Sequence, residues 1–346
     1  MPRSFSLDCL DAELRQRNGP EEWARILVLR DHPRFLAGLH RYAELMPAYY
    51  ENNVMLNKVV TEAWRFQMLV YTLHLYDSRD PADSSTGLTI ANLTRICSRQ
   101  QIASRGRVLA ILGIMQLAGY LHRRRSEADA RVVYLEPSAE FVGVVEGWNQ
   151  RILQIIDAID DTDKLANAHL ADPRFGWDMR ERGAQTLLAG WKILDPFPEV
   201  RHFVNSDGGW MLLLSCTADA LRASDGAEIA PVAVDLSNFG KRFGVSRSHL
   251  RRLLEQAYRK GLLDASPRNG QHVALSPRLV ASFLACVASE LGNYRLWALA
   301  TTNDTARKPG AARWTNHPRS SPSPSPPVPA AGRPAPRQAS RASRPL

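Results

Sequence analysis

The sequence predicts a mainly α-helical protein with small β-ribbons, in which one helical unit occurs twice. Its 346 residues are 45% apolar, which is enough to form a core in each of two ordinary domains. Apolar side chains recur at helical spacing, as at Leu236, Phe239 and Phe243. Two stretches, Trp64 to Asn92 and Trp210 to Asn238, align without a gap. Self-similarity at a fixed offset indicates an internal duplication.

The alignment continues beyond these two stretches with small changes of offset. The offset is 146 residues at first, then 142 and finally 140. The landmarks that match are Trp64 with Trp210, Asn92 with Asn238, Ser104-Arg105 with Ser246-Arg247, Gly119 with Gly261, and Leu135 with Leu275. Each change of offset falls in an expected turn, where loops tolerate insertions. We therefore expect the two copies to share one fold.

The second copy has the clearer local signals. A short helix is expected over Leu236 to Phe243, followed by a turn at Gly244-Val245. Ser246 is a good N-cap for a second helix, whose buried stripe is Leu250, Leu253, Leu254 and Ala257 and which Gly261 ends. Leu262-Leu263 and His272 to Leu275 then form a two-stranded ribbon with a polar tip at Ser266 to Gln271.

The first copy repeats this plan. Its first helix contains Leu93, Ile96 and Cys97; Ser104 caps the second helix and Gly119 ends it. A ribbon follows over Tyr120 to Leu135. A leading helix is expected over Val54 to Tyr76 and a trailing helix from Glu140 to about Asp160.

Two helices joined by a short turn, the second with a basic outer face, and then a hairpin, resemble a winged helix-turn-helix. With its leading and trailing helices, the unit is similar to the MarR family of bacterial regulators, over residues 54–160 and again over 208–300. The resemblance implies a tandem winged helix-turn-helix pseudo-dimer with long flanking helices, whereas the family usually has one such unit per subunit. The expected segments are an N-terminal helical segment 1–53, a first unit 54–160, a helical linker 161–207, a second unit 208–304 and a tail 305–346.

Positive charge is concentrated in three parts of the chain. The tail carries seven Arg and Lys308 with no acidic residue, which accounts for eight of the nine net positive charges. Because it is rich in Pro and Ser, the tail is expected to be a disordered basic arm, which either attracts phosphates without specificity or is an inert extension. Residues 88–135 and 234–278 each carry a net charge of +6, so the rest of residues 1–304 carries −11. This segregation indicates two nucleic-acid surfaces.

Within these two units, the expected DNA-binding side chains are Ser and Arg on the second helix and the ribbon of each copy. The N-terminal residues of such a helix reach base edges in the major groove, and the ribbon touches backbone or minor groove. In the first copy, Gly106, Ala110 and Gly113 leave the outer face small, so it either approaches DNA closely or packs on protein. The candidates are Ser104, Arg105, Arg107, Arg123, Arg124, Arg125, Ser246, Arg247, Ser248, Arg251, Arg252 and Arg268.

No catalytic, cofactor or metal site is expected. The chain has no P-loop, GxGxxG, HExxH or GxSxG motif, and its four Cys show no ligand spacing. Cys97, between Arg95 and Arg99, could sense redox state, but its repeat partner Phe243 favours a buried position. Asp160 to Asp163 is predicted to be an acidic helix end rather than a metal site. Without a signal sequence or a membrane span, we expect a cytoplasmic, nucleoid-associated protein.

The expected function is that of a sequence-specific, double-stranded DNA-binding transcriptional regulator. Two alternatives are a plasmid replication initiator or partition protein with tandem winged helices, and a protein–protein interaction module. A cleft near Trp64, Tyr71 or Trp148 could hold a small effector of unknown identity, or these aromatic residues fill the core. The chain forms an intramolecular pseudo-dimer in this interpretation, and further homodimerisation is possible.

Overall fold

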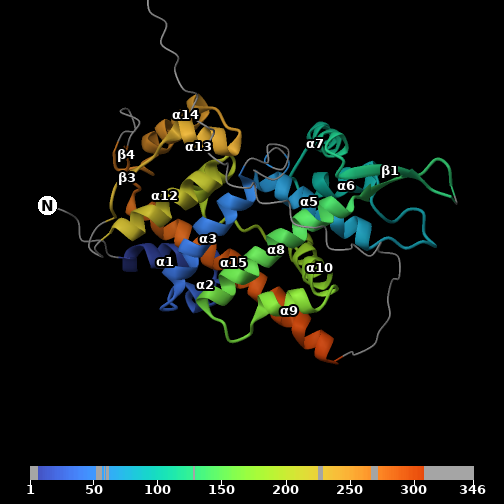
Figure 1. Ribbon diagram of the computed structural model, residues 1–346, viewed down its shortest axis with the longest axis horizontal. Coiled ribbons are helices and arrows are strands. Elements are labelled where there is room, and N and C mark those ends of the chain that lie inside the picture. Colours follow the sequence, from blue (N-terminus) through green and yellow to red (C-terminus); the bar gives the residue numbers. More distant parts are fainter. Residues whose placement is uncertain are drawn as a thin grey trace, which may run out of the picture. The chain divides into compact units, whose positions relative to one another are not determined.

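The computed structural model describes residues 7–51, 57, 59, 62–127, 129–224, 229–265 and 272–307, and these residues are mainly helical (Figure 1). The predicted mainly-α class is therefore confirmed. The helices outside the repeats are α1 (Leu7–Asn18), α2 (Pro20–Arg30), α3 (Phe35–Tyr50), α9 (Leu165–Ala171), α10 (Phe175–Leu188) and α11 (Pro198–Val204). Among the described residues, no helix combines the length and apolar character that a bilayer span needs.

A series of four helices with a small antiparallel sheet occurs twice, and the strands stand at different points of the two series. The first series is α5 (Ala63–Asp77), α6 (Ile90–Arg99), α7 (Arg105–Leu117), β1 (Leu121–Arg125), β2 (Val133–Pro137) and α8 (Ala139–Ile159). The second series is α12 (Gly209–Ala223), β3 (Val232–Ala233), α13 (Leu236–Phe243), α14 (Arg247–Arg259), β4 (His272–Val273) and α15 (Pro277–Arg307). β1 pairs antiparallel with β2, and β3 pairs antiparallel with β4.

Matching backbone hydrogen bonds relate the two series. After α7, Tyr120 N donates to Met115 O at 2.8 Å, and after α14, Leu262 N donates to Ala257 O at 3.0 Å. The intervening Gly119 and Gly261 have φ of 76° and 68°, a left-handed conformation that favours glycine and lets each helix end in a tight turn. Gly119 and Gly261, which match in the sequence alignment, therefore end equivalent helices with the same type of turn.

The ribbons close in the same way in both series. Ser138 N donates to Tyr120 O at 2.9 Å, and Ser276 N donates to Leu262 O at 3.0 Å. A third extended segment joins each ribbon: Leu135 N donates to Leu88 O at 2.9 Å in the first series, and β3 takes this place in the second.

The buried apolar residues form two clusters. One belongs to the first series and includes Leu93, Val108 and Phe141. The larger cluster joins α1 to α3 and the end of α8 to the second series, where Phe239 and Leu253 are among its members. α8 contributes to both clusters, since Phe141 packs in the first and Ile152 to Ile159 in the second. The first series therefore has a core of its own, whereas the second shares its core with the N-terminal helices.

Two predicted boundaries differ from the ends of helices in the structure. The leading helix of the first copy was expected to run without a break from Val54, which lies outside the described residues. Asn57 and Val59 are helical, but Glu62 is extended with φ −112° and ψ 144°, so α5 begins at Ala63. The tail was expected from residue 305, whereas α15 continues to Arg307. The predicted disordered arm from residue 308 onward lies outside the described residues, as does Arg268.

Candidate nucleic-acid interface

α14 carries the most basic exposed face of the two repeated helix pairs. Ser246 Oγ accepts a hydrogen bond from His249 N at 3.2 Å and so caps the helix, as predicted. One side of the helix is buried through Leu250, Leu253, Leu254 and Ala257. The other side exposes Arg247, Ser248, Arg251 and Arg252.

The arginines of this face differ in their partners. Arg251 Nε lies 2.9 Å from Glu255 Oε1, one turn further along α14. Among the described residues, neither Arg247 nor Arg252 forms an ion pair. The helix therefore presents two unpaired guanidinium groups near its first turns, where they are able to fork onto phosphate or onto the O6 and N7 atoms of guanine.

α7 has a different surface at the equivalent position. Arg105 and Arg107 are exposed, but the Arg107 guanidinium lies 5.7 Å from the ring centre of Trp64, which is consistent with a cation–π contact. Ser104 occupies the N-cap position without a capping hydrogen bond from its side chain. Beyond the first turn the outer face is small and apolar, and it exposes 39% of Leu109 and 84% of Leu117. The two copies thus share their backbone plan and differ in what they present to a partner.

The three consecutive arginines of β1 divide between the two faces of the ribbon. Arg124 pairs with Glu136 at 3.1 Å and with Glu127 at 3.2 Å. Because side chains alternate along a strand, Arg123 and Arg125 lie on the opposite face from Arg124. At most two of the three are therefore able to reach the same partner.

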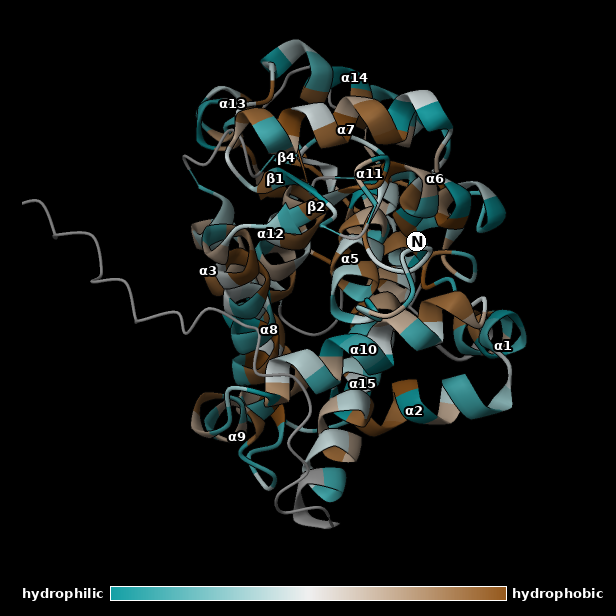
Figure 2. Ribbon diagram, turned by 90° about the vertical axis from the view of Figure 1, so that its right-hand side faces the viewer, coloured by the Kyte–Doolittle hydropathy of each residue, from teal (hydrophilic) through white to brown (hydrophobic). Residues whose placement is uncertain are grey.

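Both helices lie at the same edge of the fold. Figures 1 and 2, which differ by a 90° turn, each show α7 and α14 at the upper edge, with α13 beside α14. The two helices therefore lie on one side of the molecule rather than on opposite sides.

Two other groups that the sequence singled out have structural roles. Cys97 is buried, and burial raises the pKa of its thiol to about 11, which opposes a reactive thiolate. Asp160 and Asp163 each lie 2.9 Å from Arg295, so this acidic segment pairs with α15. Within the described ranges, no group of three or more His, Cys, Asp or Glu side chains is arranged to hold a metal ion.

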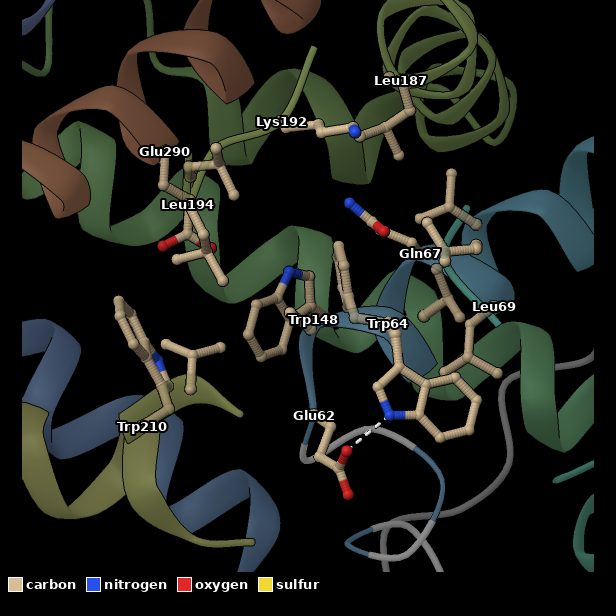
Figure 3. A pocket seen from close by; sticks show the side chains of 18 of the residues that line it. Glu62, Trp64, Gln67, Leu69, Trp148, Leu187, Lys192, Leu194, Trp210 and Glu290 are labelled. Atoms are coloured by element: carbon tan, nitrogen blue, oxygen red, sulfur yellow. Dashed lines mark hydrogen bonds between the residues drawn. The ribbon is translucent and has the colours of Figure 1, made fainter. Parts of the chain in front are cut away.

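A cavity of about 430 Å³ lies between the two repeated series (Figure 3). Trp64 and Trp148, which the sequence suggested, line it, whereas Tyr71 is a buried core residue outside it. Sequence reasoning missed the further wall residues Trp191, Trp210, Trp297 and Glu290. The available signal was Glu290 itself, the one charged residue in the stretch Leu284 to Leu291.

Among the acids of the cavity wall, Glu290 has a pKa that is clearly raised. Its Oε2 accepts a hydrogen bond from Tyr42 at 2.9 Å, and desolvation raises its pKa from 4.5 to about 7. The titratable groups around it are Tyr42 and Tyr50 from α3 and Cys286 and Tyr294 from α15, and the pKa of each is raised by its own burial first and by the Glu290 charge second or later. All four are neutral at pH 7, and in the described part of the chain Glu290 forms no ion pair.

This carboxyl makes stability depend on pH. The folded state holds the Glu290 proton more tightly than the unfolded state, so the stabilisation is complete below pH 4.5 and is lost as the pH rises towards 7. At pH 8 the free energy of unfolding of Glu290→Gln is expected to exceed that of wild type by about 3 kcal/mol, and near pH 4.5 the two are expected to be equal. Urea denaturation at several pH values measures this, and parallel curves for the two proteins would contradict it.

No protein-family model, curated protein or solved structure matches the chain.

Proposed function

We propose that the chain is a sequence-specific, double-stranded DNA-binding transcriptional regulator that carries two winged helix-turn-helix units. The observation that carries this proposal is the α14 face: Arg247, Ser248, Arg251 and Arg252 are exposed together at the start of a capped helix. In a helix-turn-helix this is the helix that enters the major groove, and its N-terminal residues contact base edges.

The remaining basic groups would hold the duplex in register. Arg123 and Arg125 on the β1–β2 ribbon would contact phosphates or the minor groove, while Arg124 remains with Glu136. Arg247 and Arg252, which lack an acidic partner among the described residues, would read guanine or bind phosphate. Charge-assisted hydrogen bonds of this kind are stronger than neutral ones.

The unequal helices predict an unequal operator. α7 offers Arg105 and Arg107 and then a small apolar face, so its half-site would be contacted through the backbone with little base readout. We expect the double variant Arg105→Ala, Arg107→Ala to weaken duplex binding by less than about tenfold, with a slope against salt that falls by about 1 to 2. Fluorescence anisotropy over a salt series measures the affinity and the slope. If this variant loses as much affinity as one with alanine at Arg247 and Arg252 of α14, the two helices do not contribute unequally.

A second function is favoured by one specific observation. The exposed Leu109 and Leu117 on α7 are typical of a helix face that packs on protein. In that case the first unit is a protein-interaction module and the second alone binds DNA. An Arg105/Arg107 variant with unchanged DNA affinity would favour this arrangement.

The proposal is tested with the full chain and fragmented genomic DNA from its source. Selection of bound fragments, followed by anisotropy on the enriched duplexes, is expected to show nanomolar binding that falls steeply with salt. Affinity for an unrelated duplex is expected to be about 1,000-fold weaker. Equal affinity for every duplex, or no binding at low salt, would overturn the proposal.

A further inference from the structure

The cavity wall contains a carboxylate, Glu290, that no cation among the described residues neutralises. Among the described residues, Glu290 forms no ion pair, and Tyr42 is its one hydrogen-bond donor, to Oε2. Although protein surrounds Glu290 closely, its side chain keeps accessible surface, because it lies on the cavity wall. A carboxylate in such a place is costly unless a partner supplies positive charge or hydrogen bonds. The Glu290 Oε1 atom, which has no donor in the described part of the chain, is available for that partner.

Aromatic residues that contact one another line the cavity together with this carboxylate. Tyr50 lies 5.8 Å from Trp148 between ring centres, Trp148 Nε1 donates to Tyr294 Oη at 3.0 Å, and Tyr294 lies 5.1 Å from Trp297. Trp210 completes the set 6.2 Å from Tyr42, the residue that bonds Glu290. Figure 3 shows Trp148 and Trp210 on the cavity wall near Glu290. Indole and phenol faces attract organic cations, and most strongly where water is excluded.

The basic residues of the wall are engaged elsewhere or lie apart from this corner. Arg180 pairs with Asp77 at 3.4 Å and with Glu146, and Arg201 donates to Leu194 O at 3.0 Å. Lys192 is exposed, and in Figure 3 it lies towards Leu187 and Gln67, away from Glu290. The corner at Glu290 therefore carries negative charge and aromatic surface, and none of the described basic residues of the wall competes there.

From this geometry we infer that the cavity is a binding site for a small organic cation that carries an aromatic or bulky apolar group. The charged nitrogen lies against Glu290 and the faces of Trp148 and Trp210, and the apolar group extends towards Trp64 and Leu69. A cavity of about 430 Å³ falls within the range of about 300–1,000 Å³ that is typical of small-molecule sites.

The wall also reaches both helix-turn-helix units. Gln101 and Ile102, in the turn between α6 and α7, line the cavity, and so does Phe243, the last residue of α13 before α14. If DNA binding changes the positions of α7 and α14, it also changes the contacts of a ligand that touches both turns. The affinity for this ligand then depends on DNA binding, and the DNA affinity depends on the ligand. This coupling rests on the proposed function, whereas binding of the cation does not.

Binding is tested without DNA on the full chain, at pH 8. The probes are benzyltrimethylammonium and its neutral carbon isostere neopentylbenzene, followed by tryptophan fluorescence and calorimetry. We expect one cation per chain, bound at least about tenfold more tightly than the isostere. Glu290→Gln is expected to remove that preference and to leave binding of the isostere unchanged. The matched control is Glu44→Gln, the same change at an exposed residue of α3, and it is expected to bind both probes as wild type does.

Two results would overturn the inference. One is equal binding of the cation by wild type and by the folded Glu290→Gln variant. The other is that wild type binds phenylacetate more tightly than benzyltrimethylammonium and that Lys192→Met loses this preference. The cavity would then be a site for anions.

A separate titration tests the coupling. The cation is expected to change the DNA affinity of wild type at least about threefold and to leave the DNA affinity of Glu290→Gln unchanged. If the cation binds but DNA affinity stays constant, the coupling is wrong and the site stands. If the chain binds no duplex, the proposed function fails while the calorimetric result is unaffected.

Discussion

Replacing Arg247, Arg251 and Arg252 together by alanine is expected to weaken binding to the preferred duplex at least about 100-fold. Two of these guanidinium groups have no acidic partner among the described residues, and the third bonds only Glu255. Their removal costs both base contacts and phosphate contacts. The slope of log K against log salt is expected to fall by about 2 to 3, since each lost phosphate contact removes about 0.9.

A matched control separates position from total charge. Arg15, Arg41 and Arg222 are also exposed, and they lie on α1, α3 and α12, outside the α14 face. Their triple alanine variant loses the same three charges and is expected to change affinity less than about threefold. If both triple variants weaken binding equally, affinity depends on overall charge and the α14 face has no special role.

Gly240→Ala is expected to destabilise the second unit strongly. A Cβ at Gly240 would fall within 3.0 Å of Val245 O, in the turn that joins α13 to α14. The turn would have to open, which weakens the 2.9 Å bond from Val245 N to Gly240 O and separates the two helices. We expect the free energy of unfolding to fall by about 3 to 4 kcal/mol, with loss of DNA binding at 37 °C.

The same substitution at Gly113 is the control. A Cβ there meets no atom within 4 Å, because this part of α7 faces outward. Alanine has the higher helix propensity, so Gly113→Ala is expected to stabilise the protein by about 0.5 to 1 kcal/mol. Chemical denaturation measures both variants, and equal effects of the two would show that the turn at Gly240 tolerates a side chain.

The sequence was sufficient to predict the elements whose ends carry local signals. α13 occupies Leu236–Phe243 as expected, because Asp235 caps its start and Gly244 ends it with φ 69°. The caps at Ser246 and the terminal glycines 119 and 261 were found for the same reason. The break at Glu62 was not predicted, because no Gly or Pro marks it.

The cavity and the inequality of the two units depended on tertiary packing. Trp148 and Tyr294 are far apart in the sequence and meet only because α8 and α15 pack together. Sequence alone could identify Trp64 and Trp148 as candidates, but it could not separate them from Tyr71, which the core encloses. The small residues of α7 were visible in the sequence, whereas the exposure of Leu117 required the structure.

The central claim is that α14 reads DNA sequence while α7 holds a neighbouring half-site. The most direct measurement is a nucleotide-resolution footprint of the full chain on its preferred genomic fragment. We expect two protected half-sites about 10 base pairs apart, with strong base preference in one and weak preference in the other. In the variant with alanine at Arg247, Arg251 and Arg252, protection of the strong half-site is expected to be lost before protection of the weak half-site. A footprint without sequence preference, or one that this variant leaves intact, would contradict the account.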